Sequence, residues 1–264
     1  MIVSAQSPIL LFDSGFGGLS VLAAVRETLP DAPVIYAADL AGLPYGEKTE
    51  AEIAARVAGL LGRLAERYQP RLICIACNTA STIALGMVRD VLEIPIVGTV
   101  PAIKPAAALT KTGVIGLLGT AATIRQGYVD DLEAKFATDK KLIRYAAPEL
   151  VHAAELLLRG GTPDPAIFEQ VANDLRSKAG DAEIDTVVLA CTHFPLLEAQ
   201  LRAAFGQEVR FVDGAAGIAH RVAHLTQDQA FERDGPGLAI VTGPVDQTLA
   251  HALQPYGLSV IERL

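Results

Sequence analysis

Residues 72–81 read Leu-Ile-Cys-Ile-Ala-Cys-Asn-Thr-Ala-Ser, and residues 186–195 repeat the design as Thr-Val-Val-Leu-Ala-Cys-Thr-His-Phe-Pro. In each, an apolar run typical of a buried strand ends at a cysteine, Cys77 or Cys191, and small polar residues follow. A residue between a parallel strand and the next helix lies at the open edge of an α/β sheet, where ligands bind. Helix N–H groups there favour a thiolate. Two such cysteines predict a site built from two facing halves.

The rest of the chain alternates strand and helix patterns. We expect strands at Ile9–Asp13, Val34–Ala38, Leu72–Ala76, Ile94–Gly98, Val114–Leu118, Thr186–Ala190, Val209–Val212 and Leu238–Thr242, with helices rich in Ala, Leu and Arg between most of them. Helix starts are marked by Thr49 with Glu52 three positions on, by Thr120, and by Pro165 in a first turn. This alternation predicts an α/β fold with mainly parallel, doubly wound sheets.

Two similar α/β domains account best for the two cysteine segments in a chain of 264 residues. We expect residues 1–99 with 208–264 to form the first domain, which carries Cys77, and residues 100–207 to form the second, which carries Cys191. The crossings would lie at the Pro-rich segment Val100–Pro105 and around Gly206.

Composition excludes several classes of partner. A formal charge of −8 and a pI near 5.1 argue against a nucleic-acid or anionic membrane surface. The longest uncharged stretch, Leu72 to Val88, is too short and too polar to span a bilayer. Met1 to Pro8 has no basic region of the kind that opens a signal peptide, so we expect a cytoplasmic protein. An odd count of 3 cysteines points to reduced thiols.

Two arrangements resemble metal sites. Cys74 and Cys77 have the C-x-x-C spacing of zinc and dithiol sites, but strand side chains alternate, so residues three apart point to opposite faces. Cys74 is more simply a core residue. His220 and His224 lie four apart on an expected helix without a third ligand, which is more typical of surface histidines. We therefore expect no metal.

The glycine-rich stretch 13–20 follows a strand and opens a helix, as a dinucleotide site would. Its third glycine position is Ser20, however, and Asp13 would repel a pyrophosphate. The loop suits a small anion such as a carboxylate better. His193 can exchange protons near neutral pH beside Cys191. The segment 44–49 is either a plain loop before a capped helix or a loop that grips substrate.

Four motifs in this order resemble those of the glutamate racemase family: Asp-Ser-Gly-Phe-Gly-Gly at 13–18, Pro-Tyr-Gly at 44–46, Cys-Asn-Thr-Ala-Ser at 77–81 and Cys-Thr-His-Phe-Pro at 191–195. Shorter matches at 94–98 and 119–123 extend the similarity over nearly the whole chain. Relatives that decarboxylate malonates keep one of the two cysteines, whereas this chain has both. It departs from the family at His152, where a proline is usual, and at residues 37–42.

The resemblance implies two α/β domains facing across a cleft, and interconversion of L- and D-glutamate for bacterial peptidoglycan without cofactor or metal. It implies that Cys77 and Cys191 are the catalytic pair, that Asp13 assists the first, and that His193 with Glu155 assists the second. The substrate-binding residues would be Asp13, Ser14, Tyr45, Gly46, Asn78, Thr79, Thr192 and His193.

The chemistry is consistent with that reading, because inverting an α-carbon requires an acid/base group on each face. A carboxylate beside a thiol raises the thiol's pKa, so Asp13 would accept a proton or orient Cys77. The alternatives that stay open are a racemase of the aspartate or hydantoin type, a decarboxylase or hydrolase that uses a single cysteine, and a binding protein that closes on an amino acid. The oligomeric state also stays open, with a homodimer as one candidate.

Overall fold

Two parallel sheets organise the computed structural model, which describes residues 3–264. The larger sheet has the order β10-β9-β2-β1-β3-β4 and the smaller has the order β6-β5-β7-β8, with every pairing parallel. The α/β fold with parallel sheets is therefore confirmed. The strands are β1 (Ile9–Asp13), β2 (Val34–Ala38), β3 (Leu72–Ile75), β4 (Ile96–Gly98), β5 (Val114–Gly119), β6 (Lys141–Ala146), β7 (Thr186–Ala190), β8 (Arg210–Val212), β9 (Gly237–Val241) and β10 (Leu258–Arg263).

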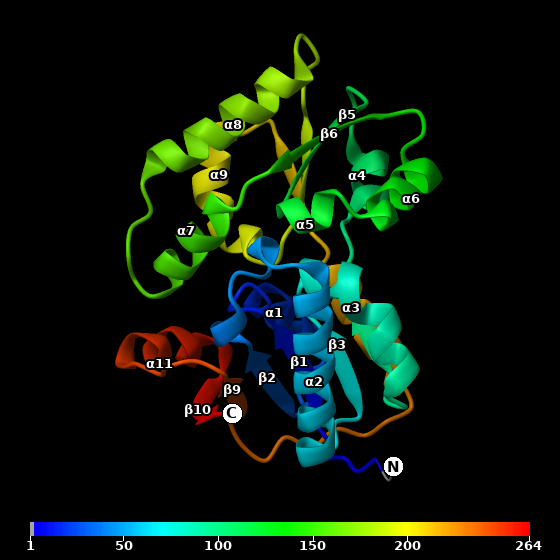
Figure 1. Ribbon diagram of the computed structural model, residues 1–264, viewed down its shortest axis with the longest axis vertical. Helices are drawn as coiled ribbons and strands as arrows, with labels where there is room; N and C mark the ends of the chain where they lie inside the picture. Colours follow the sequence, from blue (N-terminus) through cyan, green and yellow to red (C-terminus); the bar gives the residue numbers. More distant parts are fainter. Residues whose placement is uncertain (1–2) are drawn as a thin grey trace.

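Helices cover both faces of the six-stranded sheet, and together they form the first lobe (Figure 1). Side chains alternate along β1, so Ile9 and Leu11 enter one core and Leu10 and Phe12 enter the other. The first core is closed by α1 (Leu19–Thr28), α10 (Ala215–Leu225) and α11 (Gln247–Leu253). The second is closed by α2 (Glu50–Tyr68) and α3 (Asn78–Val91).

The four-stranded sheet is covered in the same way and forms the second lobe, drawn above the first in Figure 1. Val187 and Leu189 face α7 (Glu149–Leu158), α8 (Pro165–Ala179) and α9 (Glu198–Phe205). Val188 and Ala190 face α4 (Ile103–Leu109) and α6 (Gly127–Phe136). The remaining short elements are α5 (Ala121–Ile124), η1 (Leu40–Gly42), η2 (Tyr45–Glu47), η3 (Phe194–Leu197) and η4 (Gln254–Tyr256).

The expected helix starts are confirmed. Thr49 and Glu52 form a reciprocal capping box at α2, and Pro165 lies in the first turn of α8. The Thr120 hydroxyl accepts the N–H of Thr123 at the start of α5. Each cap satisfies N–H groups that have no partner within the helix, so these positions are fixed locally by sequence.

The eight expected strands are present, with bounds within about two residues, but β6 and β10 were not expected. Both are edge strands of their sheets. Most of their side chains are partly or fully exposed, and Lys141, Arg144 and Arg263 interrupt their apolar pattern. Charged residues are common on edge strands because they discourage further pairing, and this hides the strand signal.

The expected division at residues 207 and 208 needs a correction. Strand β8 pairs with β7 in the smaller sheet, so Arg210–Val212 belongs with the second lobe and the chain returns to the first lobe after Val212. The first crossing lies between β4 and α4, at the Pro-rich segment. Among residues 3–264, no helix has the length and apolar character that a membrane crossing needs.

Each sheet has one point where the strand order reverses, between β1 and β3 in the first lobe and between β5 and β7 in the second. Ligands of parallel α/β sheets bind beyond the carboxyl ends of the strands at such switch points. Ser14 follows β1 and Cys77 follows β3, while Thr120 follows β5 and Cys191 follows β7. The topology therefore brings each cysteine to the switch point of its own lobe.

Candidate active site

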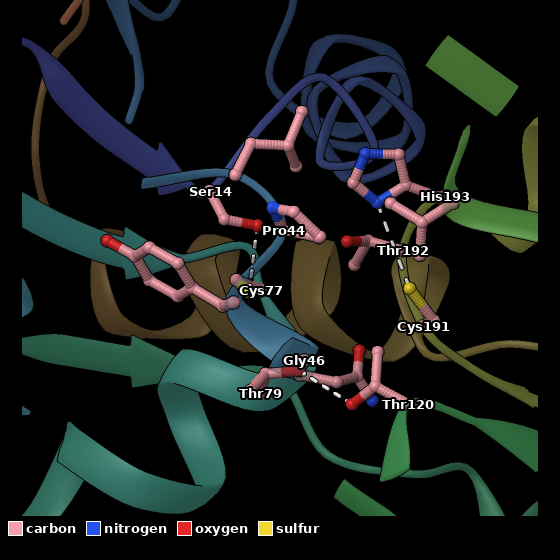
Figure 2. Close-up of a pocket in the computed structure, with 13 residues that line it drawn as sticks. Ser14, Pro44, Gly46, Cys77, Thr79, Thr120, Cys191, Thr192 and His193 are labelled. Atoms are coloured by element: carbon pink, nitrogen blue, oxygen red, sulfur yellow. Dashed lines mark hydrogen bonds between the residues drawn. The ribbon is translucent and has the colours of Figure 1, made fainter. Parts of the chain in front are cut away.

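The two switch points open on one small cavity of about 20 Å³ between the lobes. Figure 2 shows Cys77 and Cys191 on opposite sides of it. A space of this size holds about one water molecule. Its walls are Ser14, Leu43, Pro44, Tyr45, Gly46, Cys77, Asn78, Thr79, Thr120, Val151, Cys191, Thr192 and His193.

Cys77 is the N-cap of α3, and its sulfur accepts the N–H of Ala80 at 3.5 Å. The Ser14 hydroxyl lies 3.7 Å from the same sulfur. Burial, reinforced by the charge of Asp13, raises the pKa of the Cys77 thiol far above its ordinary value, and these two effects outweigh the helix N–H. The helix start therefore does not lower the pKa of this thiol as expected, whereas the effect of Asp13 has the expected direction.

Asp13, the last residue of β1, is fully buried behind Cys77 and does not line the cavity. Its Oδ2 accepts the N–H of Gly18 at 2.9 Å and the hydroxyl of Tyr36 at 3.4 Å. Its Oδ1 has no hydrogen-bond partner within residues 3–264. Burial raises the pKa of Asp13, and the charge of His193 opposes that rise.

Cys191 follows β7 directly and has an imidazole beside it. Its sulfur lies 3.8 Å from Nδ1 of His193, and Nε2 of His193 lies 2.9 Å from Oε1 of Glu155. Burial disfavours a charged imidazole, but the hydrogen bonds with Cys191 and Glu155 outweigh it and raise the pKa of His193 well above its ordinary value. Burial likewise opposes the charge of Glu155, but His193 holds its pKa below the ordinary value. The two form an ion pair behind Cys191.

The glycine-rich loop after β1 binds carboxylates of the protein itself. The N–H of Phe16 donates to Oε1 of Glu155 at 2.8 Å, from one lobe to the other, and the N–H of Gly18 donates to Oδ2 of Asp13. A Cβ on Gly17 would lie 2.4 Å from Nδ1 of His193, so only glycine allows this approach. The preference for a small anion predicted for the loop is thus met by side chains.

Hydroxyl groups join the lobes at the lower wall in Figure 2. Thr79 Oγ1 lies 2.9 Å from Thr120 Oγ1 and 3.2 Å from Thr123 Oγ1. A Cβ on Gly46 would lie 2.9 Å from Cβ of Thr120, so the turn at 45–46 also touches the second lobe. The wall of the cavity on this side is therefore made by both lobes in contact.

Most of the residues singled out from the sequence line the cavity: Ser14, Tyr45, Gly46, Cys77, Asn78, Thr79, Cys191, Thr192 and His193. Asp13 and Glu155 stand behind it, each next to one cysteine or its histidine. Four lining residues were not predicted as site residues, although Pro44 opens the 44–49 segment: Leu43, Pro44, Thr120 and Val151. Thr120 carried a signal, since it follows β5 as Cys191 follows β7, whereas Leu43 and Val151 are ordinary apolar residues in the sequence.

The two metal-like arrangements come apart in the structure. Cys74 is fully buried in the core under α1 and α10, while Cys77 lies in the opposite core, as strand alternation predicted. His220 and His224 are exposed on α10. Over the described part of the chain, no three His, Cys, Asp or Glu side chains come together as a metal site would require.

A family model described as Asp/Glu/Hydantoin racemase matches residues 19–222. This match covers most of the chain, both cysteines included. The chain belongs to the Asp/Glu/Hydantoin racemase family.

Relatives that match nearly the whole chain include glutamate racemases. One from Sphingopyxis alaskensis is 59% identical over 97% of each chain. The crystal structure of the Escherichia coli glutamate racemase, in complex with L-glutamate and the activator UDP-MurNAc-ala, aligns with a TM-score of 0.90 at 40% identity over 98% of each chain. A glutamate racemase from Bacillus anthracis aligns with a TM-score of 0.84 at 26% identity, again over 98% of each. The chain is thus an amino-acid racemase of the glutamate racemase type.

Proposed function

We propose that this enzyme interconverts L- and D-glutamate by a two-base mechanism in which Cys77 and Cys191 act on opposite faces of the α-carbon, without a cofactor. The observation that supports this most is that two free thiols, one from each lobe, line a single small cavity. A mechanism with one cysteine gives no reason for the second thiol to be there. The product D-glutamate would serve peptidoglycan synthesis, as the family resemblance implies.

The proton balance follows from the neighbours of each thiol. With L- or D-glutamate bound, the thiolate of one cysteine takes the α-proton while the thiol of the other gives its proton to the opposite face of the carbanion. Burial and the charge of Asp13 raise the pKa of Cys77 and so favour its thiol form, which makes it the donor for the first inversion. Cys191 is the acceptor in that step, and the charged imidazole of His193, 3.8 Å from its sulfur, stabilises negative charge on that sulfur before the transfer.

The polar wall supplies the contacts for substrate. We assign the ammonium and carboxylate groups of glutamate to Ser14, Asn78, Thr79, Thr192 and the 45–46 turn, all at the cavity. The N–H groups at the start of a helical turn have no partner within the turn and suit a carboxylate. Donors aimed at the α-carboxylate also stabilise the charge that develops on it in the transition state.

The cavity of about 20 Å³ is much smaller than glutamate, whose volume is several times that of water. Substrate entry therefore requires the walls to separate. Because both lobes contribute walls, a change in the distance between lobes is the simplest way to admit glutamate.

The experiment is racemisation of L-glutamate in deuterated water by the wild-type, Cys77→Ser, Cys191→Ser and Cys74→Ser proteins. The wild-type D-product should carry deuterium while the remaining L-glutamate stays protiated early in the reaction. Each active-site substitution should lower the rate by more than the roughly 10²–10⁴-fold assigned to one acid or base, since neither face works alone. Cys74→Ser is the matched control, because its thiol does not line the cavity and lies in the other core, and it should keep the mechanism.

Wild-type turnover by either active-site variant would contradict the two-base mechanism and favour an enzyme that uses one cysteine. Equal early deuteration of substrate and product would contradict it as well. Parallel assays with aspartate test the aspartate-type alternative, which would be supported if aspartate turned over faster than glutamate.

A further inference from the structure

We infer that Asp39 and Arg56 form a positioning pair that holds the Tyr45–Gly46 turn against the cavity and so determines how well the site binds its substrate. Neither residue lines the cavity. The inference rests on the proposed function, because it assigns these side chains a role in the binding of glutamate. It concerns the part of the cavity wall formed by Tyr45 and Gly46, which carries neither thiol.

Asp39 stands just beyond the end of β2 and its side chain is fully buried. Its two oxygens accept four hydrogen bonds. Oδ2 receives Nε of Arg56 at 2.7 Å and the hydroxyl of Tyr45 at 2.7 Å. Oδ1 receives Nη2 of Arg56 at 2.6 Å and the hydroxyl of Thr242, beyond the end of β9, at 2.6 Å. The bidentate arginine fixes the plane of the carboxylate, so the direction in which it accepts the tyrosine is also fixed.

Tyr45 is the link between this pair and the cavity. The residue is almost completely buried, lines the cavity, and commits its hydroxyl to Asp39. Its hydroxyl is therefore an anchor and not a contact for substrate. A Cβ on Gly42 would lie 2.3 Å from Oδ2 of Asp39 and 2.7 Å from the ring of Tyr45, so the backbone before the turn packs closely against both side chains.

Gly46, the residue after Tyr45, contacts the second lobe. Gly46 packs on Thr120, which also lines the cavity and contacts Thr79. A shift of the anchored tyrosine therefore moves the turn relative to both lobes. The two thiols are positioned by β3 and β7 and not by this turn. The Asp39–Arg56 pair should therefore affect substrate binding more than proton transfer.

The test compares the steady-state kinetics of Asp39→Asn, Tyr45→Phe and the double variant with wild type. Asn keeps one acceptor but turns an amide N–H₂ toward a donor, so we expect KM for L-glutamate to rise roughly 10- to 100-fold, equal to the loss of one or two charge-assisted hydrogen bonds. The value of kcat and the deuterium isotope effect on it should change by less than about 3-fold. The double variant should be little worse than Asp39→Asn, because both substitutions remove the same link.

Asp185→Asn is the matched control. Asp185 also accepts several hydrogen bonds, from the hydroxyl of Thr110 and the N–H groups of Lys111 and Thr112, but it lies at the start of β7, at the end of that strand opposite Cys191. It should lower the midpoint of thermal unfolding while leaving KM unchanged, which separates positioning from general stability. Arg56→Lys keeps the charge and loses the bidentate geometry, so its KM should lie between wild type and Arg56→Met.

An unchanged KM in active Asp39→Asn protein would overturn the inference, as would additive effects in the double variant. If Asp39→Asn does not fold, the Arg56→Lys and Arg56→Met pair decides in the same way. Absence of racemisation by wild type would instead overturn the proposed function, so the two failures are distinguishable.

Discussion

Replacing Glu155 with Gln isolates the charge in the ion pair behind Cys191. In the structure one atom, Oε1, accepts both the N–H of Phe16 at 2.8 Å and Nε2 of His193 at 2.9 Å. A glutamine oxygen in that place can accept the same two donors. The substitution therefore preserves the hydrogen-bond geometry and removes only the negative charge.

The magnitude follows from the value of that charge in a buried place, where His193 is 3% and Glu155 12% exposed at the side chain. Hydrogen bonds to charged groups are worth about 1.5–3 kcal/mol, compared with about 0.5–1.5 kcal/mol between neutral groups. A loss of about 1.4 kcal/mol corresponds to one pKa unit. We therefore expect the pKa of His193 to fall by roughly one unit in Glu155→Gln, from a wild-type value above the ordinary 6.5.

The same shift has consequences for stability. The raised pKa of His193 adds stability that is complete below the ordinary histidine value of 6.5 and is lost as pH rises through the folded value. The lowered pKa of Glu155 adds stability that is complete above 4.5 and is lost as pH falls through the folded value. The pair is therefore worth most between these two values. The variant should lose stability mainly in that window and show a flatter dependence on pH.

The assay is an NMR titration of ring C–H signals in histidine-labelled protein, with thermal unfolding followed across the same pH range. Glu149→Gln is the matched control: it removes a charge from the first turn of the same helix, and the hydrogen bonds of His193 in the described chain do not involve it. A wild-type His193 pKa at or below its ordinary value would refute the reasoning. So would an equal pKa in wild type and Glu155→Gln.

Two further predictions concern the packing of the site. Gly17→Ala should displace His193, because the added Cβ would lie 2.4 Å from its ring and 2.5 Å from its backbone N; overpacking of this kind costs about 1–3 kcal/mol of stability, and activity should fall with it. Gly62→Ala on α2 is the control, because the added Cβ meets nothing within 4 Å, and it should be neutral or stabilising. Wild-type rates in Gly17→Ala would show that the lobes do not meet as described. Alkylation of native protein, read by peptide mass mapping, should modify Cys77 and Cys191 and be slowed by glutamate. Cys74 should stay unmodified because it is fully buried in the core and, unlike Cys77 and Cys191, does not line the cavity, and modification of Cys74 at a similar rate would contradict its placement.

The sequence predicts those parts of the site that depend on local rules. Strand periodicity and helix caps place Cys77 and Cys191 at strand ends, and the same rules separate Cys74 from Cys77 onto opposite faces. Thr120 obeys these rules as well, since it follows β5, but a hydroxyl residue at a cap has a local explanation that hides its place at the cavity. Local reasoning therefore finds where side chains stand along each strand.

The connections between lobes are beyond such rules. Phe16 and Glu155 are 139 residues apart in sequence, and Asp39 and Thr242 are 203 apart, so no spacing indicates that they meet. The effect of Asp13 on the pKa of Cys77 was expected from the sequence, but the larger effect of burial was not, because it depends on how completely the thiol is enclosed. Tertiary packing therefore decides which distant residues form hydrogen bonds, and whether the pKa of a thiol at a helix start is lowered or raised.

Asp13 and His193, one from each lobe, are electrostatically linked across the boundary between the lobes. The charge of His193 lowers the pKa of Asp13, and the charge of Asp13 helps raise the pKa of His193. The Phe16 N–H that holds Glu155 also crosses this boundary. Because a cavity of about 20 Å³ must widen to admit glutamate, widening separates these groups and weakens their attraction. Water that enters the widened cavity also relieves burial, which is the largest influence on both pKa values and acts on each in the direction opposite to the attraction, so the closed arrangement as a whole and not the attraction alone sets the two pKa values.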